Sequence, residues 1–419
     1  MRKHVPLLAL LLLTLVFRSN AETLSDSSWP QWRGPTRNGE FIGPSWPAKL
    51  DDGHLKKIWR VELGPSYSGP IVAGKLVYTT ETKDKKFEVV TAFDRATGKQ
   101  VWQSRWDGAM SVPFFAKSNG DWIRSTPALD GDRLYVVGMR DVLVCLDAAT
   151  GAEKWRKDFV KELGTPLPDF GSVCSPLIDG DALFIQAGGS VARLDKLSGR
   201  ILWRSMQDSG GMMGSAFSSP VLADLAGKRQ LVVQTREKLA GLDPANGKVL
   251  WEQPVEAFRG MNILTPVSYK DMLFTSAYGG KTIGFKIAQS GGSMTVAEAW
   301  RNKSQGYMST PVVIDGVAYE HLKSQRVMAI EIETGRELWT TDQSFGKYWS
   351  LVAQGDRILA LDQRGLLLLL RANKEKFELL DKRQLTEAET WAHLAVAGDQ
   401  LFIRELHALV AYHWVQDAP

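Results

Sequence analysis

The stretch Gly241-Leu242-Asp243-Pro244-Ala245-Asn246-Gly247-Lys248-Val249-Leu250-Trp251 reads as a strand, a tight turn and a second strand that ends in Trp. Close copies of it, here called the cassette, recur along the chain with the same spacing from the acidic residue to Gly to Trp. One match would be an ordinary hairpin, but five at a constant spacing indicate an internal repeat. The other copies are Asp94–Gly98–Trp102, Asp147–Gly151–Trp155, Asp195–Gly199–Trp203 and a looser one, Glu331–Gly335–Trp339.

A second shared piece precedes each cassette and begins with a small polar residue followed by Pro, as in Ser125-Thr126-Pro127. Proline is tolerated at the start of a strand, where only one ladder donor is lost. The Gly-Asp and Asp-Gly pairs that follow are typical of hairpin turns. Each repeat therefore holds four short strands. Four antiparallel strands roughly every 45 residues are the signature of a propeller blade.

Eight such blades can be counted. Six begin at prolines 70, 127, 176, 220, 266 and 311, and two more begin near Trp349 and Trp391 without a proline. The last shows only three strands, whereas Lys57-Ile58-Trp59-Arg60-Val61 is an isolated outer strand with no strands before it. The chain is thus predicted to be an all-β, eight-bladed β-propeller of four-stranded antiparallel blades, closed by an N-terminal strand that completes the last blade.

The cassette residues are predicted to be structural. Each Trp is expected to dock between neighbouring blades, where a large ring covers the gap between two twisted sheets. The Asp carboxylates suit turn N–H groups, and the glycines adopt positive φ without steric cost. Repetition of these carboxylates argues against a catalytic role.

The N-terminus is typical of a secretory signal. Arg2-Lys3-His4 precedes an apolar run from Val5 to Phe17 and a small-x-small cleavage site that ends at Ala21. We expect a cleavable signal peptide at 1–21, an arm at 22–54 that lies on the domain, and the propeller at 55–419. An uncleaved anchor is the alternative, but the run is shorter than the roughly 20 apolar residues that span a membrane. No Cys lies directly after the apolar run, which argues against a lipid anchor.

Composition and charge narrow the function classes. The 419 residues, 44% hydrophobic and 23% charged, are ordinary for a soluble globular protein. Loss of Arg2, Lys3 and Arg18 with the signal would bring the net charge of +4 close to neutrality. No Lys/Arg cluster indicates nucleic-acid binding. We expect a periplasmic or secreted protein and a monomer. Whether Cys145 and Cys174 pair or stay as buried thiols is open.

Function is expected on one face of the ring. The turns between first and second and between third and fourth strands are short and repeated, whereas the opposite face carries long, varied loops. Binding residues concentrate on such loops. The residues just before each first strand should converge on the channel mouth, where aromatic and cationic side chains suit a planar anion. The alternative is that they only plug and solvate the channel. The converging positions are Tyr67, Arg124, Val173, Phe217, Ile263, Met308, Trp349 and Ala392.

Catalytic signatures are scarce. The sequence has no Cys-x-x-Cys-His for c-type haem, no clustered Cys and His for zinc, and no phosphate-binding Gly loop. His321 reads as a polar side chain rather than a general base. No catalytic residue is predicted, and a metal ligand cannot be assigned.

The Ser/Thr-Pro strand followed by Leu-Asp-x-x-x-Gly-x-x-x-Trp resembles the repeat of the pyrroloquinoline quinone (PQQ)-type eight-bladed propellers, over nearly the whole mature chain. That family includes quinoprotein alcohol dehydrogenases, which bind PQQ with calcium or a lanthanide in the channel. It also includes non-enzymatic scaffolds similar to BamB of the outer-membrane β-barrel assembly machinery. The chain lacks the adjacent Cys pair of the dehydrogenases and the lipobox Cys of BamB.

The resemblance implies an exported, non-catalytic binding or scaffold protein of the cell envelope, holding an envelope protein or small ligand on the loop-rich face. The alternative is a PQQ-dependent dehydrogenase that oxidises alcohols or sugars, with PQQ and Ca²⁺ as possible cofactors. Carbohydrate binding through exposed aromatics has no motif behind it. The quinone would be held by Arg124, Asn262, Trp349 and Trp391, and a ligand or partner by Tyr67, Tyr307, Lys347, Tyr348 and His393.

Overall fold

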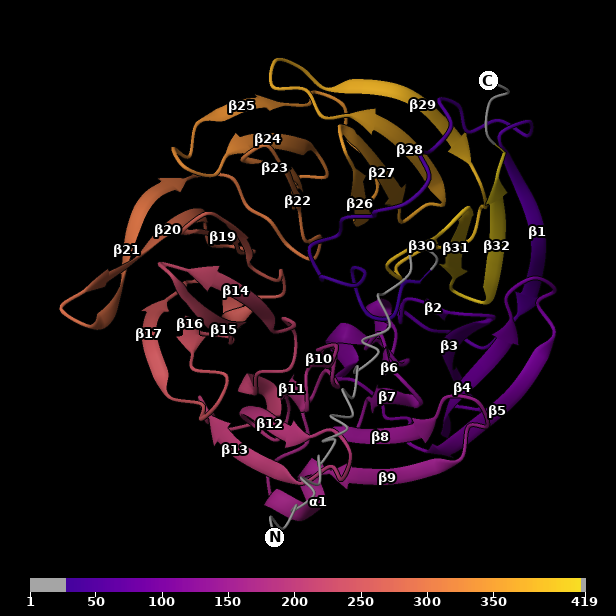
Figure 1. Ribbon diagram of the computed structural model, residues 1–419, viewed down its shortest axis with the longest axis horizontal. Helices are drawn as coiled ribbons and strands as arrows, with labels where there is room; N and C mark the ends of the chain where they lie inside the picture. Colours follow the sequence, from indigo (N-terminus) through magenta and orange to yellow (C-terminus); the bar gives the residue numbers. More distant parts are fainter. Residues whose placement is uncertain (1–27, 416–419) are drawn as a thin grey trace, which may run out of the picture.

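Eight four-stranded antiparallel sheets form a ring around a central channel in the computed structural model, which describes residues 28–415 (Figure 1). The all-β, eight-bladed prediction is confirmed. In the described part of the chain, helix is limited to α1 (Phe159–Leu163) and the 3₁₀ turns η1 (Phe114–Asn119), η2 (Gly211–Met213) and η3 (Phe258–Gly260). The predicted signal peptide lies outside the described residues.

In each blade the first strand lies nearest the channel and the fourth lies at the rim (Figure 1). Blades 1 to 4 are β2(Ile71–Ala73), β3(Leu76–Lys83), β4(Phe87–Asp94) and β5(Gln100–Asp107); β6(Ala128–Asp130), β7(Arg133–Gly138), β8(Val142–Asp147) and β9(Glu153–Asp158); β10(Leu177–Asp179), β11(Ala182–Gln186), β12(Val191–Asp195) and β13(Ile201–Ser205); β14(Val221–Leu225), β15(Lys228–Gln234), β16(Lys238–Leu242) and β17(Val249–Pro254).

The second half of the ring follows the same order. Blades 5 to 8 are β18(Val267–Tyr269), β19(Met272–Ser276), β20(Thr282–Ser290) and β21(Ser293–Asn302); β22(Val312–Ile314), β23(Val317–His321), β24(Val327–Glu331) and β25(Glu337–Thr340); β26(Trp349–Gln354), β27(Arg357–Asp362), β28(Leu366–Arg371) and β29(Glu378–Gln384); β30(Ala395–Ala397), β31(Gln400–Glu405), β32(Ala408–Trp414) and β1(Leu55–Glu62).

The last blade is closed by the N-terminal strand, as predicted. Strand β1 pairs antiparallel with β32, and Val61 lies opposite Leu409 in this register. An ion pair of 2.7 Å between Arg60 and Glu405 of β31 adds to the pairing. The closure leaves the first and last blades as neighbours and removes one exposed sheet edge.

Six of the eight blades are latched to the next through an outer-strand Trp. The indole N–H of Trp102 donates to the carbonyl of Ala148, in the cassette turn of the next blade, at 2.9 Å. The ring lies against Gly151, where a Cβ atom would overlap it. The predicted docking of Trp between blades is therefore confirmed. Equivalent bonds join Trp59 to Arg95, Trp155 to Lys196, Trp203 to Pro244, Trp300 to Ile332 and Trp339 to Asn373.

Blade 5 departs from the pattern. Instead of a cassette it has the long hairpin β20–β21, which turns at Gly291 and Gly292 and projects beyond the ring (Figure 1). The Trp of the preceding blade therefore has no cassette turn to meet. The indole N–H of Trp251 donates instead to Oε1 of Gln230 in its own blade, at 2.6 Å.

The cassette turns are held as expected. Oδ1 of Asp94 accepts the backbone N–H of Thr97 at 2.8 Å and its hydroxyl at 2.6 Å. Gly98 adopts a φ of 70°, which glycine takes freely. The carboxylates thus hold turns, which accounts for their repetition.

The arm runs across the channel and ties distant blades together. Trp29 exchanges two backbone hydrogen bonds with Val72 of blade 1. The buried guanidinium of Arg33 donates to the carbonyls of Thr310 and Pro311 in blade 6, at 2.8 and 2.7 Å. That of Arg37 donates to the carbonyls of Ser175 and Pro176 in blade 3, at 3.1 and 2.6 Å.

If the Trp latch holds the ring, removing one should be costly. We expect Trp102→Ala to lower the free energy of unfolding by about 3–5 kcal/mol, because it opens a cavity and leaves the Ala148 carbonyl with only the Tyr78 hydroxyl, at 3.2 Å, as its donor. Urea unfolding measures the change. Val101→Ala, at a half-exposed neighbouring position, is the matched control. A loss for Trp102→Ala no larger than that of the control would contradict the latch.

Candidate functional site

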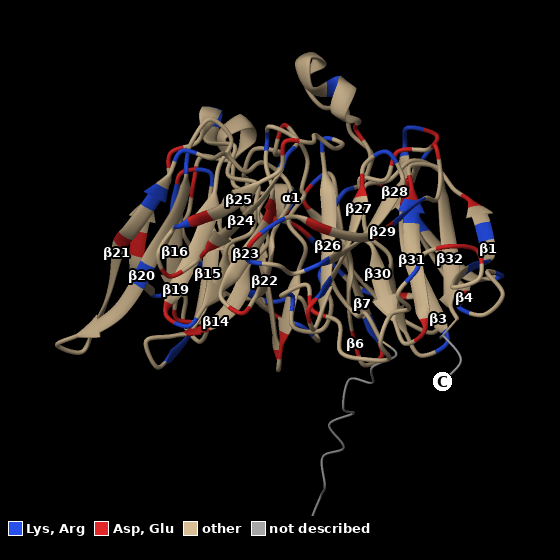
Figure 2. Ribbon diagram, turned by 90° about the horizontal axis from the view of Figure 1, so that it is seen from above, with Lys and Arg blue, Asp and Glu red and all other residues tan. Residues whose placement is uncertain are grey.

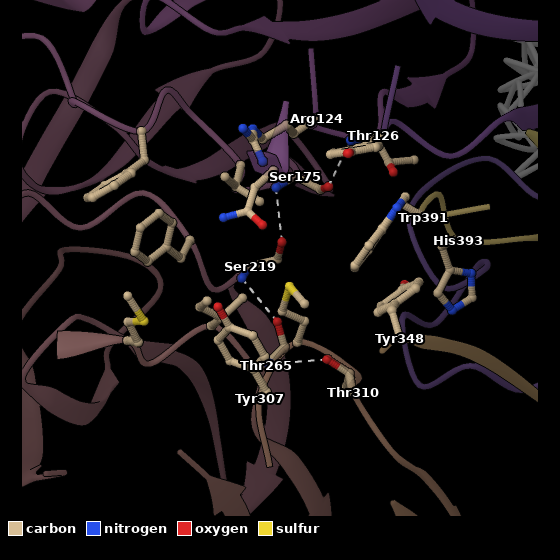
Figure 3. A pocket seen from close by; sticks show the side chains of 18 of the residues that line it. Arg124, Thr126, Ser175, Ser219, Thr265, Tyr307, Thr310, Tyr348, Trp391 and His393 are labelled. Carbon is tan, nitrogen blue, oxygen red and sulfur yellow. Dashed lines mark hydrogen bonds between the residues drawn. The ribbon is translucent and has the colours of Figure 1, made fainter. Parts of the chain in front are cut away.

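A cavity of about 290 Å³ lies at the channel mouth, where the chain leads into the first strand of each blade (Figure 3). Seven of the eight predicted converging positions line it, all except Ala392, whose neighbours Trp391 and His393 line it instead. The propeller thus brings together residues that are far apart in the sequence. The seven are Tyr67, Arg124, Val173, Phe217, Ile263, Met308 and Trp349.

A chain of hydroxyl groups runs around the cavity wall (Figure 3). In blades 1 to 5, the backbone N–H of the residue before the first-strand proline donates to the hydroxyl of the equivalent residue in the next blade. The sequence pattern marked these positions only as strand starts. The sequence feature that could have revealed this row of hydroxyl groups is the Ser or Thr that recurs before Pro. The bonds run from Gly69 to Thr126, Ser175, Ser219, Thr265 and Thr310, at 2.9 to 3.2 Å.

The arm closes the far side of the cavity. It contacts Val72 within β2 and the carbonyls of Pro176 and Pro311, each of which directly follows a residue of the hydroxyl chain. Trp32, also in the arm, lines the cavity, with the guanidinium carbons of its two arginine neighbours, Arg33 and Arg37, at 5.6 and 5.4 Å from its ring. Access is therefore from the loop-rich face.

One wall of the cavity is aromatic. Tyr348 and Trp391 are stacked, with ring centroids 6.0 Å apart and planes 22° apart (Figure 3). Tyr67 packs on Trp391 at 5.7 Å. Tyr307 lines the cavity as well. These four residues offer flat apolar faces, which suit aromatic or aliphatic groups.

Two arginines give the cavity its charge. The Arg124 guanidinium lies 5.5 Å from the Tyr67 ring. Arg236 is only 4% exposed and lies 4.9 Å from the Phe217 ring. Burial lowers the pKa of both side chains, yet arginine stays protonated at neutral pH. No Asp or Glu belongs to the cavity lining among the described residues. The site is therefore aromatic and electropositive.

Three of the predicted site residues do not present a side chain for binding in the cavity. The Asn262 amide donates to the carbonyls of Arg236 and Val255, at 3.0 Å each, and lies outside the lining. Lys347 is exposed and also lies outside it. Trp349 is fully buried, and its indole donates to Asp362 at 3.1 Å. Asn262 and Trp349 therefore support the wall, and Lys347 lies at the surface outside it.

The lining includes residues that sequence patterns did not single out. Arg236 lies in the short turn between β15 and β16. Phe115 and Phe170 belong to long loops between blades, and Trp32 belongs to the arm. None of these positions shares the repeat, so periodicity gave no signal for them.

His393 and the cysteines are buried without reactive character. His393 Nδ1 lies 2.8 Å from the Leu394 carbonyl, and burial together with Arg33 lowers its pKa to about 3. Cys145 and Cys174 are separate, buried thiols in the structure. Burial raises the pKa of Cys145 to about 11 and that of Cys174 to about 12. The imidazole is thus neutral and both thiols are protonated at neutral pH.

The residues present do not fit a calcium-bound quinone. Ca²⁺ takes six to eight oxygen ligands, with carboxylates prominent among them. The lining supplies hydroxyl groups but no carboxylate. Across residues 28–415, no group of three or more His, Cys, Asp or Glu side chains is placed to hold a metal ion.

Exposed apolar side chains lie on the same loop-rich face as the cavity mouth. They sit on three helical turns between blades, and Figure 2 shows the short helical segments on one face of the ring, opposite the tip of β20–β21. A cluster of this kind marks an interaction surface. We call it the apolar rim: Phe114 (85% exposed), Phe115 (50%), Met212 (44%), Met213 (43%) and Phe258 (47%).

The chain is similar to known envelope proteins. The family described as outer membrane protein assembly factor BamB matches residues 86–341. The outer membrane protein assembly factor BamB of Yersinia pestis is 20% identical over 324 residues, which cover 76% of this chain and 68% of that protein.

Two solved structures share the fold. The crystal structure of BamB from Moraxella catarrhalis has a TM-score of 0.63 at 16% identity, covering 87% of this chain and 99% of that chain. The quinohemoprotein alcohol dehydrogenase from Comamonas testosteroni has a TM-score of 0.52 at 13% identity, covering 94% of this chain and 81% of that chain. At such identities the two structures show the fold alone.

The buried His393 predicts a pH effect on stability. In the unfolded chain a His side chain has a pKa near 6.5, whereas the pKa of His393 in the native protein is about 3. Wild-type stability should therefore fall with pH below about 6.5. We expect His393→Asn to remove about 2 kcal/mol of the loss between pH 7 and 5.

Urea unfolding at both pH values measures this difference. His321, Glu88 and Glu320, whose pKa values burial also shifts, are present in both proteins and cancel. His413→Asn, at a partly exposed position beside Asp399, is the control. An unchanged pH slope in His393→Asn would show that the ring is protonated in the native state.

Proposed function

This chain belongs to the family of the outer membrane protein assembly factor BamB, and on that basis we propose that it is a non-catalytic binding protein of the cell envelope. It holds a partner protein on its loop-rich face. The apolar rim is the observation that carries this proposal. Five large apolar side chains on one face are costly to leave in water, and a protein partner would cover them.

The scaffold supports such a role. Loops that bind need a rigid base, and here the Trp latches and the arm tie the blades to one another. The relatives carry the name of outer membrane protein assembly factors. We therefore propose that the partner belongs to the outer-membrane protein assembly machinery.

Export to the periplasm or beyond forms part of the proposal. It rests on the signal-like N-terminus and on the envelope location in the relatives' name. Within residues 28–415, no helix has the length and apolar character needed to cross a bilayer.

The rim can be tested by substitution. We expect Phe114→Ser combined with Met212→Ser and Phe258→Ser to reduce recovery of outer-membrane assembly proteins at least tenfold, because the apolar contact centre is lost. Affinity capture from a detergent-solubilised bacterial outer-membrane extract, quantified by mass spectrometry, measures this. The control carries serine at Val101 and Leu197, which are exposed apolar residues of cassette hairpins. Equal recovery by the two variants would argue against the rim as the docking surface.

The dehydrogenase alternative has its own test. Its support is the fold shared with the quinohemoprotein alcohol dehydrogenase, whereas the lining lacks carboxylates for the metal. We expect purified protein supplied with PQQ and Ca²⁺ to show no dye reduction with primary alcohols or glucose above a protein-free blank. Substrate-dependent reduction that is lost in Arg124→Gln would establish the dehydrogenase instead.

A further inference from the structure

We propose that the cavity at the channel mouth receives an acidic, apolar peptide segment of the docked partner, with a carboxylate at Arg236 and Arg124 and neighbouring apolar side chains on the aromatic wall. The inference rests on the proposed function and names the chemistry of the segment that is bound. It concerns a cavity deeper than the rim, so the two can be tested separately.

Unused hydrogen-bond donors define where the carboxylate would bind. Nε and Nη1 of Arg236 and Nε of Arg124 are buried and have no hydrogen-bond partner in the described part of the chain. Buried donors without acceptors are unfavourable, and a carboxylate would supply charge-assisted bonds to them. Asp208 and Glu237 near Arg236, and Asp121 near Arg124, act on these cations, but none of the three lines the cavity.

The cavity walls select the groups beside the carboxylate. Phe170 and Phe217 lie under the Arg236 guanidinium, and the stacked Tyr348 and Trp391 form another part of the lining (Figure 3). Such walls favour aromatic or aliphatic side chains next to the acid. A volume of about 290 Å³ lies at the lower limit of ligand sites. It therefore admits a short segment but no folded domain.

The rim favours a peptide over a free small molecule. Phe115 belongs to both the rim and the lining, so apolar surface continues from the outer face into the cavity. A small ligand enclosed below would leave Phe114, Met212 and Phe258 in water. A polypeptide covers the rim and fills the cavity together. Since the arm closes the far side, the segment enters and leaves through the mouth.

Two matched peptides test the inference on the full chain. Acetyl-Phe-Asp-Phe-amide and acetyl-Phe-Asn-Phe-amide differ only in the carboxylate, and isothermal titration calorimetry measures both. We expect the Asp peptide to bind at least tenfold more tightly at low salt, with the preference reduced by added NaCl. Arg236→Gln should abolish the preference while leaving the Asn peptide's affinity unchanged. Arg229→Gln, at an exposed ion pair with Asp179, should keep it.

Several outcomes of these measurements would contradict the inference. Equal affinities for the two peptides, or a preference that survives both Arg236→Gln and Arg124→Gln, would overturn it. So would benzoate binding as tightly as the Asp peptide, since that would indicate a small-molecule site. Thermal melting checks that each variant folds, and Arg124→Gln serves if Arg236→Gln does not. Loss of the peptide preference with intact capture through the rim would reject this inference and leave the proposed function standing.

Discussion

The hydrogen bond from an outer-strand Trp to the next blade's turn is the contact on which the ring depends. A blade on its own is a twisted sheet with two exposed faces, and a propeller is stable only when neighbours cover them. The indole covers apolar surface and at the same time satisfies a turn carbonyl, so it fixes both the distance and the angle between blades. Trp251 is the exception that shows how the contact depends on the next blade. Where the next blade carries the long β20–β21 hairpin, the indole bonds to Gln230 in its own sheet.

The repeat made the fold predictable and left much of the site hidden. Cassette spacing and the isolated Trp59 were enough to count eight blades and to pair β1 with β32, since both features are local and periodic. The arm's bonds from Arg33 to Thr310 and Pro311 join residues that no periodicity relates. The arm was expected to lie on the domain, and nothing in its sequence indicated that it crosses the channel.

Within the candidate site, some residues could be predicted from the sequence and others could not. Converging positions such as Tyr67, Arg124 and Phe217 follow from ring geometry, because every first strand starts at the same radius. Which side chains face the cavity depends on loop conformation. Ile263 lines it, whereas the adjacent Asn262 turns to the carbonyls of Arg236 and Val255. Arg236, with its unused donors, became visible only once the turns between second and third strands were placed beside the mouth.

Closure of the last blade also determines when the protein can finish folding. Arg60 and Glu405 are 345 residues apart in the sequence, and the strands that carry them meet only after nearly all of the chain has emerged. Loop-closure entropy grows slowly with loop length, but contacts this distant slow folding strongly. Blades 1 to 7 can assemble in order as the chain appears, each on the one before. The final pairing then converts an open stack into a closed ring, in which every blade has a neighbour on both sides. A contact that forms last and joins the two ends of the chain is expected to slow unfolding as well as folding.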